Sequence, residues 1–245
     1  MAEVFAYDQG RVVKLDRPEW SGVSAFESEV ITKAADAGLP VARSHGVVTI
    51  DDRCGMILDR IDGRELMGDL SEADAAAVAP LAARFVDLQM SINDTEIEGL
   101  PDLVSRLGGE LARSGLAPGV VRQLTDDLAT LDDGRRGVCH FDFHPNNVMV
   151  SGDEWVVIDW LGVASGPPAA DLARTLVLCG QWIDPPIKTF MEEVRRLGMA
   201  GHGIDDETCD SWIRVLAGAR LAEGFDGAFA AWLRSVAAGK VLLFA

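Results

Sequence analysis

The sequence has few of the residues that build disulfide frameworks or histidine-rich metal sites. It contains four cysteines and four histidines in 245 residues. The cysteines stand singly and form no Cys-x-x-Cys pair, which favours a reduced, cytoplasmic protein over a disulfide scaffold or a zinc site. No apolar run is long enough to span a bilayer, and no basic segment followed by an apolar one marks a signal peptide.

Basic residues are also scarce. Lysine and arginine number 22 against 39 aspartates and glutamates, so the formal net charge is −17. This balance argues against nucleic acid and anionic membranes as partners. It favours cationic ligands, although solubility alone explains most of it. The sequence leaves the oligomeric state open.

The pattern of apolar residues changes near residue 61. Before it, residues 2–7, 11–15, 47–50 and 55–58 have the composition of strands, and residues 24–37 have the period of a helix. After it, helical patterns dominate. They cover a segment opened by Ser71 and Asp74, followed by residues 102–113, 119–131, 169–182, 186–197, 206–223 and 226–243.

This order predicts an α+β protein with two lobes. Residues 1–61 would form a small N-terminal lobe built on an antiparallel sheet, and residues 62–245 a larger helical lobe. At the start of the first helix, Ser24 and Glu27 have the spacing of a capping box. In the helical lobe, Pro80 should kink its helix or shift the helix start.

Residues 140–159 interrupt the helical part with a different pattern. Two short β-branched or aromatic runs, 148–150 and 155–158, flank the turn residues Ser-Gly-Asp-Glu. A hairpin centred on this turn places residue 147 opposite residue 158. Two oxygen ligands, Asn147 and Asp159, would then lie side by side at the base of the hairpin.

Asp142 stands five residues before Asn147, on the loop that leads into the hairpin. A carboxylate near a two-oxygen magnesium clamp is suited to take a proton from a hydroxyl while phosphate is transferred. Two other interpretations remain open. The His-x-Asp-x-His pattern of residues 140–144 also occurs in metallohydrolase sites, although these need more histidines, and the loop could be purely structural.

The spacing His-x-Asp-x-x-x-x-Asn, followed by strand, turn, strand and Asp, resembles the catalytic loop and metal-binding Asp of protein kinases. The form His-x-Asp-x-His-Pro-x-Asn, with Ile-Asp-Trp after the hairpin, is more similar to the aminoglycoside phosphotransferase and choline kinase family. This resemblance implies a protein-kinase-like fold, with ATP and magnesium as cofactors. Asp142 would be the catalytic base, His140 would brace the loop, and Asn147 and Asp159 would hold the metal. Phe141 departs from the family pattern, which usually has Gly there.

The N-terminal part extends the resemblance over nearly the whole chain. It implies that Lys14, on the second strand, contacts the phosphates of ATP. Glu29 would orient Lys14, because residues 26–29 resemble the family's apolar-Glu-x-Glu; Glu27 is the rival for this role. Main-chain groups of Asp59 and Ile61 would hydrogen-bond adenine.

Two further features follow from the resemblance. Asp171, in an Asp-Leu-Ala segment, would order the catalytic region from the start of a helix. The strand and glycine-containing turn that usually open a kinase lobe are missing before residue 10. Because backbone amides in that turn bind phosphate, we expect weak ATP binding.

Together these features predict a cytoplasmic, ATP-dependent phosphotransferase that acts on a hydroxyl of a small molecule, aminoglycoside phosphotransferase-like. Alternatives within the family are choline, macrolide and ketosamine-type kinases. A choline-type site would need an aromatic cage, to which Trp182, Trp212 and Trp232 could contribute. The alternative outside enzymes is a nucleotide-binding pseudokinase. Acceptor identity is beyond the sequence.

Overall fold

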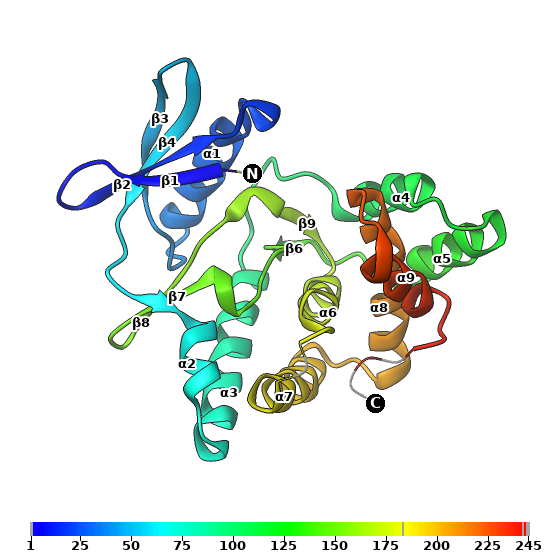
Figure 1. Ribbon diagram of the computed structural model, residues 1–245. Helices are drawn as coiled ribbons and strands as arrows, with labels where there is room; N and C mark the ends of the chain where they lie inside the picture. The colour runs from blue at the N-terminus through cyan, green and yellow to red at the C-terminus, as the bar shows by residue number, and fades with distance from the viewer. Residues whose placement is uncertain (1, 183, 242, 244–245) are drawn as a thin grey trace. The chain divides into compact units, whose positions relative to one another are not determined.

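A computed structural model describes residues 2–182, 184–241 and 243 of the chain (Figure 1). The chain packs as two compact units. The first unit comprises residues 1–69 and 145–163, and the second comprises residues 70–144 and 164–245. The hairpin of the sequence motif thus belongs to the first unit. The predicted boundary between a nucleotide-binding lobe of residues 1–61 and a helical lobe of residues 62–245 stays a prediction.

The first unit contains a four-stranded antiparallel sheet with the order β1-β2-β4-β3. Its strands are β1 (Ala2–Ala6), β2 (Arg11–Asp16), β3 (Ser44–Ile50) and β4 (Arg53–Asp59). They match the four predicted strand segments. Among the residues that the structure describes, one strand precedes the strand that carries Lys14.

Helix α1 (Val23–Asp36) packs on this sheet through an apolar face that includes Val30, Ile31 and Ala34. The predicted capping box of Ser24 and Glu27 is wrong. The side chain of Asp16, at the end of β2, accepts hydrogen bonds from the amides of Gly22 and Ser24 at 2.9 and 3.3 Å and from the Ser24 hydroxyl. A carboxylate from a neighbouring strand therefore satisfies the first turn, where a local Ser–Glu pair was expected.

A second, three-stranded sheet of the first unit has the order β5-β7-β8. Its strands are β5 (Arg64–Glu65), β7 (Val148–Ser151) and β8 (Glu154–Val157). Val157 also donates its amide to Pro40 O at 2.8 Å, which ties the hairpin to the segment between α1 and β3. Short 3₁₀ turns precede and follow the hairpin, at Pro145–Asn147 and Trp160–Gly162.

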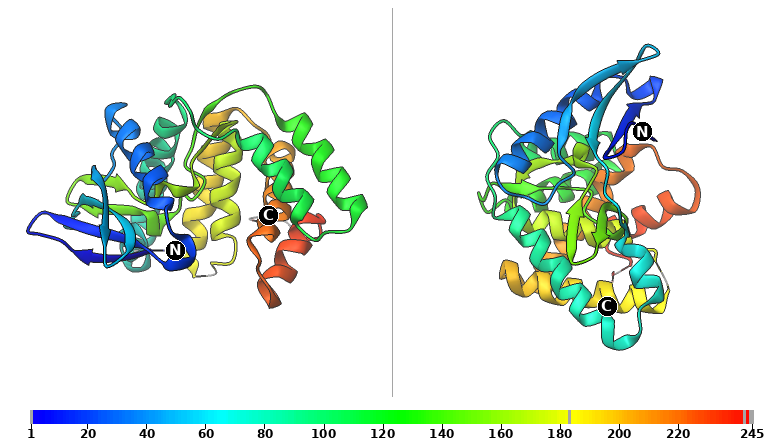
Figure 2. Two further views of the ribbon diagram at one scale, coloured as in Figure 1. Left: turned by 90° about the horizontal axis from the view of Figure 1, so that it is seen from above. Right: turned by 90° about the vertical axis from the view of Figure 1, so that its left-hand side faces the viewer.

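The second unit is mainly helical (Figures 1 and 2). Helix α2 (Leu66–Glu72) leads into it from the first unit. The α-helices that lie wholly within the second unit are α3 (Ala75–Asn93), α4 (Leu103–Arg113), α5 (Pro118–Leu131), α6 (Pro168–Cys179), α7 (Pro185–His202), α8 (Asp206–Arg220) and α9 (Gly227–Ala237). Helix α8 contacts α4, α5, α6 and α9, and α3 packs along α7. No helix of the described residues has the length and apolar character needed to cross a membrane.

These helices follow the predicted pattern with local differences. Asp74 caps α3 by accepting from Ala76 N and Ala77 N at 3.0 and 2.9 Å, whereas Ser71, expected to share that role, lies in α2. Helix α3 begins at Ala75 and continues through Pro80. The predicted last helix ends at Ala237, and part of its expected range, residue 242, lies outside the described residues.

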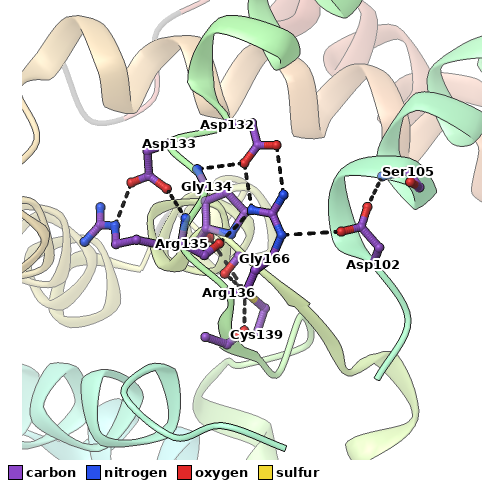
Figure 3. Close-up of polar contacts among 11 residues, drawn as sticks. Asp102, Ser105, Asp132, Asp133, Gly134, Arg135, Arg136, Cys139 and Gly166 are labelled. Atoms are coloured by element: carbon purple, nitrogen blue, oxygen red, sulfur yellow. Dashed lines mark hydrogen bonds and ion pairs between the residues drawn. The ribbon is translucent and has the colours of Figure 1, made fainter. Parts of the chain in front are cut away.

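Two short strands in the second unit lie on either side of the motif residues in the sequence. Strand β6 (Gly137–Cys139) pairs antiparallel with β9 (Ala164–Gly166). Just before β6, Arg136 lies between Asp132 and Asp102 (Figure 3), with contacts of 2.8 and 3.0 Å to the first and 3.5 Å to the second. Arg136 thereby links the end of α5 to the start of α4. Because this ion pair is partly exposed, it contributes little to the stability of the fold.

Candidate active site

The hairpin brings the ends of the motif together as the sequence predicts. Val148 pairs with Val157, and Ser151 with Glu154, across a turn in which Gly152 has φ +58°. The amide of Ile158 donates to the carbonyl of Asn147 at 3.0 Å. The expected pairing of residue 147 with residue 158 is confirmed. Asn147 and Asp159 therefore stand at neighbouring positions at the base of the hairpin.

Asp159 adopts the left-handed conformation, with φ +64° and ψ +67°. This backbone region is uncommon for residues other than glycine and persists where the surroundings hold it. The following residue, Trp160, supplies that hold. Its ring is buried and donates to Val157 O at 3.0 Å, and its amide donates to the Glu27 carboxylate at 3.1 Å.

Lys14 connects the sheet, the helix and the hairpin of the first unit. Its Nζ lies 2.8 and 2.9 Å from the two carboxylate oxygens of Glu27 and 3.1 Å from Oδ1 of Asp159. Lys14 and Glu27 are largely buried, whereas the side chain of Asp159 is 34% exposed. A cation held between two carboxylates in this way is fixed in direction before any ligand binds.

The surroundings shift the pKa values of Lys14 and Glu27. Burial acts to lower the pKa of Lys14, but the carboxylates of Glu27 and Asp159 outweigh it and raise the pKa above its ordinary value of 10.5. Burial raises the pKa of Glu27 above 4.5, with Lys14 acting in the opposite direction. Lys14 is therefore firmly protonated near neutral pH, and the Glu27 carboxylate depends on Lys14 for compensation.

The predicted pairing of Lys14 with Glu29 is wrong. Glu29 is 65% exposed and pairs with Lys33 on its own helix at 2.7 Å. Two positions along a helix turn the side chain by about 200°, so Glu27 and Glu29 face opposite ways. The sequence does indicate that Glu27 is the buried glutamate, because Glu27 lies on the same helix face as the apolar residues Val30 and Ile31.

The first unit contains a cavity of about 390 Å³ next to this triad. Lys14, Glu27 and Asp159 lie in its wall. The remaining lining residues are Ala2, Val4, Val12, Asp16, Val23, Ile31, Ala42, Leu58, Asp59, Arg60, Ile61, Met149, Val157, Ile158, Trp160 and Leu161. The wall is thus mostly aliphatic, and two of its carboxylates, Glu27 and Asp159, contact Lys14.

The predicted hinge residues Asp59 and Ile61 both line this cavity. The amide of Asp59 donates to Arg43 O at 3.0 Å, and the amide of Arg60 donates to Gly10 O at 2.9 Å. Those two donors are engaged within the protein. The side chain of Asp59 also contacts His45 Nε2 at 2.6 Å.

The predicted catalytic base lies in the second unit, on the loop after β6. The ring of His140 is fully buried and meets the ring of Phe143 edge-on, with centroids 6.0 Å apart. The amide of Asp142 donates to His140 Nδ1 at 3.3 Å. His140 therefore touches the backbone of Asp142, which is the geometry expected of a residue that braces the loop. The catalytic roles of both residues stay predictions.

Asp171 anchors the same loop from the first turn of α6. It is fully buried, and its Oδ1 accepts from the amide of Phe141 at 2.8 Å. Its Oδ2 accepts from Asn93 at 3.0 Å and from Gln89 at 3.2 Å. The expected ordering role of Asp171 is confirmed as a set of contacts. Its partners Asn93 and Gln89, both on α3, could not be identified from the sequence.

His144, for which the sequence indicated no role, has two neighbours in the second unit. Its Nε2 lies 3.7 Å from Asp142 Oδ1, and its ring meets that of Trp182 edge-on at 6.1 Å. His144 thus lies beside both the Asp142 carboxylate and the Trp182 ring.

The proposed metal ligands can be tested against the chemistry of their donors. Magnesium prefers oxygen ligands and is usually held by one or two carboxylates together with phosphate oxygens and water. Asp159 offers a partly exposed carboxylate at the wall of the cavity, and Asn147 offers an amide oxygen from the paired position of the hairpin. The donor set therefore fits magnesium held jointly with a nucleotide.

The sequence profile of the phosphotransferase enzyme family matches residues 4–202. This match spans most of the chain, including Lys14, residues 140–147 and the hairpin. The chain belongs to the phosphotransferase enzyme family. No curated protein sequence gives a significant match.

Solved structures of small-molecule kinases share the fold. A thermostable mutant of aminoglycoside phosphotransferase APH(4)-Ia, in a ternary complex with AMP-PNP and hygromycin B, aligns with a TM-score of 0.66 at 15% identity, covering 98% of this chain and 92% of that one. APH(3'')-Id from Streptomyces rimosus ATCC10970, in complex with ADP and streptomycin, aligns with a TM-score of 0.60 at 17% identity, covering 89% and 92%. The amicoumacin kinase hAmiN, in complex with AMP-PNP, Ca²⁺ and Ami, aligns with a TM-score of 0.62 at 15% identity, covering 96% and 85%. The predicted α+β, protein-kinase-like fold is confirmed.

Proposed function

We propose that this phosphotransferase moves the γ-phosphoryl group of ATP to a hydroxyl group of a small molecule. The observation that carries the proposal is the position of Lys14. It is held between Glu27 and Asp159 at the wall of a mostly aliphatic cavity. Phosphoryl transfer needs a fixed cation and an oxygen ligand for a metal ion close together, beside a pocket for the nucleotide base.

The nucleotide base would occupy the aliphatic part of the cavity. An adenine edge needs one acceptor for its amino group and one donor for its ring nitrogen. In this proposal the carbonyl of Asp59 and the amide of Ile61 supply them. The AMP-PNP and ADP complexes of the structural relatives support ATP as the nucleotide.

Lys14 would contact the phosphates, with Glu27 in the orienting role first given to Glu29. The proposal uses Asn147 and Asp159 to hold magnesium. When bound, magnesium neutralises charge on the phosphates and fixes their orientation. Asp159 would then exchange its contact with Lys14 for the metal, and Lys14 would keep its two bonds to Glu27.

Asp142 would accept the proton of the acceptor hydroxyl. His140 would hold the backbone of Asp142 from one side, and Asp171 would hold the preceding residue from another. These contacts act on the backbone of the loop, so they would fix the position from which the Asp142 side chain extends.

The proposed acceptor is an aminoglycoside-like compound. Hygromycin B and streptomycin are present in the complexes of two structural relatives, and the net charge of −17 favours a cationic acceptor. One of the three tryptophans considered for a choline-type cage, Trp212, is buried in the core, so it presents no face to an acceptor.

A screen for acceptor-dependent ATP consumption tests the proposal. Purified protein with Mg²⁺ and ATP is supplied with amino sugars, macrolides, choline-like alcohols or ketosamines. The expected result is ADP formation with one acceptor class, together with a product heavier by one phosphoryl group. Nucleotide binding without transfer to any class would favour the pseudokinase interpretation.

A further inference from the structure

Phe141, immediately before the proposed base, has a backbone conformation that bulky residues rarely adopt. Its φ is +66°, and its side chain is buried. Glycine takes this conformation without steric cost, whereas a phenylalanine needs surroundings that hold it there.

Two hydrogen bonds hold the Phe141 backbone. Its amide donates to Asp171 Oδ1 at 2.8 Å, and its carbonyl accepts from Arg174 Nε at 3.1 Å. Both partners lie on α6. These bonds act on the main chain, so they would serve a glycine equally well and do not explain the aromatic side chain.

Two arginines contact the ring itself. The guanidinium carbon of Arg106, on α4, lies 4.2 Å from the ring centre, and that of Arg174 lies 4.9 Å from it. Burial lowers the pKa of the Arg106 guanidinium, and Glu110, at 3.7 Å, opposes that shift. Glu223 pairs with Arg174 at 2.9 Å. An aromatic ring is a favourable partner for guanidinium groups withdrawn from water in this way.

We propose that Arg106 and Arg174 clamp the ring of Phe141, and that this clamp fixes the left-handed turn that aims Asp142. The three residues are positioning residues, and none is assigned a contact with substrate. The proposal rests on the proposed function, in which Asp142 is the base. It differs from a purely structural role because loosening the clamp should reduce the catalytic step more than it reduces nucleotide binding.

A double-mutant cycle between Arg106 and Phe141 tests the clamp. The variants are Arg106→Met, Phe141→Gly and the double substitution, with Arg122→Met on the exposed side of α5 as the matched control and Phe141→Tyr as the conservative replacement. Removing a desolvated cation–ring contact, by either single substitution, should lower kcat roughly 3- to 30-fold and leave KM for ATP unchanged.

In the Phe141→Gly background, Arg106→Met should lower kcat further by less than about twofold, because the ring is already gone. Phe141→Tyr should retain kcat within about twofold, as should Arg122→Met.

Hydrogen exchange of residues 140–144 gives a second readout that does not depend on finding the acceptor. Exchange should be faster in Arg106→Met and Phe141→Gly than in the wild type and the Arg122→Met control, at temperatures where melting curves show all four to be folded. Unchanged exchange, a wild-type kcat in Phe141→Gly, or fully additive losses in the double variant would overturn the clamp. A wild-type protein that transfers no phosphate, but whose exchange responds as described, would refute the proposed function and leave the clamp intact.

Discussion

The ammonium group of Lys14 contacts both carboxylate oxygens of Glu27, a residue thirteen positions away on α1. One oxygen of that carboxylate also accepts from the amide of Trp160, beside Asp159. Glu27 therefore fixes the cation and the hairpin end at the same time. A buried carboxylate in this position should matter more to the protein than any other acid on the helix.

The two glutamates of α1 provide a matched comparison. Glu27→Gln should lower kcat/KM for ATP roughly 10- to 100-fold, since it weakens charge-assisted hydrogen bonds worth about 1.5–3 kcal/mol each. Glu29→Gln, an equal change of charge at an exposed site, should leave kcat/KM within about twofold. Steady-state kinetics on both variants checks this. A larger loss in Glu29→Gln would restore the sequence-based pairing.

Replacing Lys14 by methionine should make the free energy of unfolding depend more strongly on pH. The pKa of Lys14 is raised, so in the wild type its contribution is complete below about pH 10 and is lost only as pH rises through the raised value. In Lys14→Met, burial of Glu27 lacks compensation. The folded state then retains a proton that the unfolded chain releases above the ordinary pKa of 4.5, so the free energy of unfolding falls as pH rises from there.

Urea unfolding at about pH 5 and about pH 8 measures this dependence. The drop in unfolding free energy between the two values should be larger in Lys14→Met than in wild type by ~1–3 kcal/mol. Lys33→Met, which removes an exposed lysine from an ion pair on the same helix, is the control and should behave as wild type. A parallel pH dependence in all three proteins would show that Glu27 does not rely on Lys14.

The rise in melting temperature on addition of Mg²⁺-ATP distinguishes residues that bind the metal from residues that only stabilise the fold. Asp159→Asn and Asn147→Ala should each remove most of the melting-temperature rise that Mg²⁺-ATP produces, because the metal neutralises the triphosphate. Asp153→Asn, in the exposed turn of the same hairpin, should keep that rise. An equal rise in all variants would mean that other groups hold the metal.

Substitution of the proposed base should affect chemistry and spare binding. Asp142→Ala is expected to lower the rate of phosphoryl transfer roughly 10²–10⁴-fold, the usual range for a general base. Nucleotide binding, measured by calorimetry, should remain close to that of the wild type. Near-normal turnover of the true acceptor would remove Asp142 from this role.

How much the sequence could predict depended on whether the deciding contacts are local. The hairpin register followed from a turn and two short runs, so the pairing of residues 147 and 158 was predictable. Lys14 on a strand was predictable for the same reason. Choosing between Glu27 and Glu29 required knowing which face of the helix each side chain occupies. The resemblance to the family pattern favoured Glu29, whereas the spacing of the apolar residues would have placed Glu27 on the buried face.

Contacts between segments far apart in the chain were beyond sequence reasoning. The expected local capping box at Ser24 did not form, because the Asp16 carboxylate at the end of β2 accepts from the amides of Gly22 and Ser24. The departure at Phe141 was visible in the sequence, but its arginine partners come from α4 and α6. The phase of each helix and the packing of one against another decide which of many arginines meets that ring.

Phosphorus NMR of a reaction containing ATP, Mg²⁺ and each acceptor class in turn shows whether the protein transfers phosphate to a hydroxyl. We expect a new phosphate-ester resonance with one class, formed in step with ADP by the wild-type protein and suppressed in Asp142→Ala. The proposed transfer would be refuted if nucleotide bound in a way that requires Lys14 and Asp159, yet ATP stayed intact or yielded only inorganic phosphate with every class.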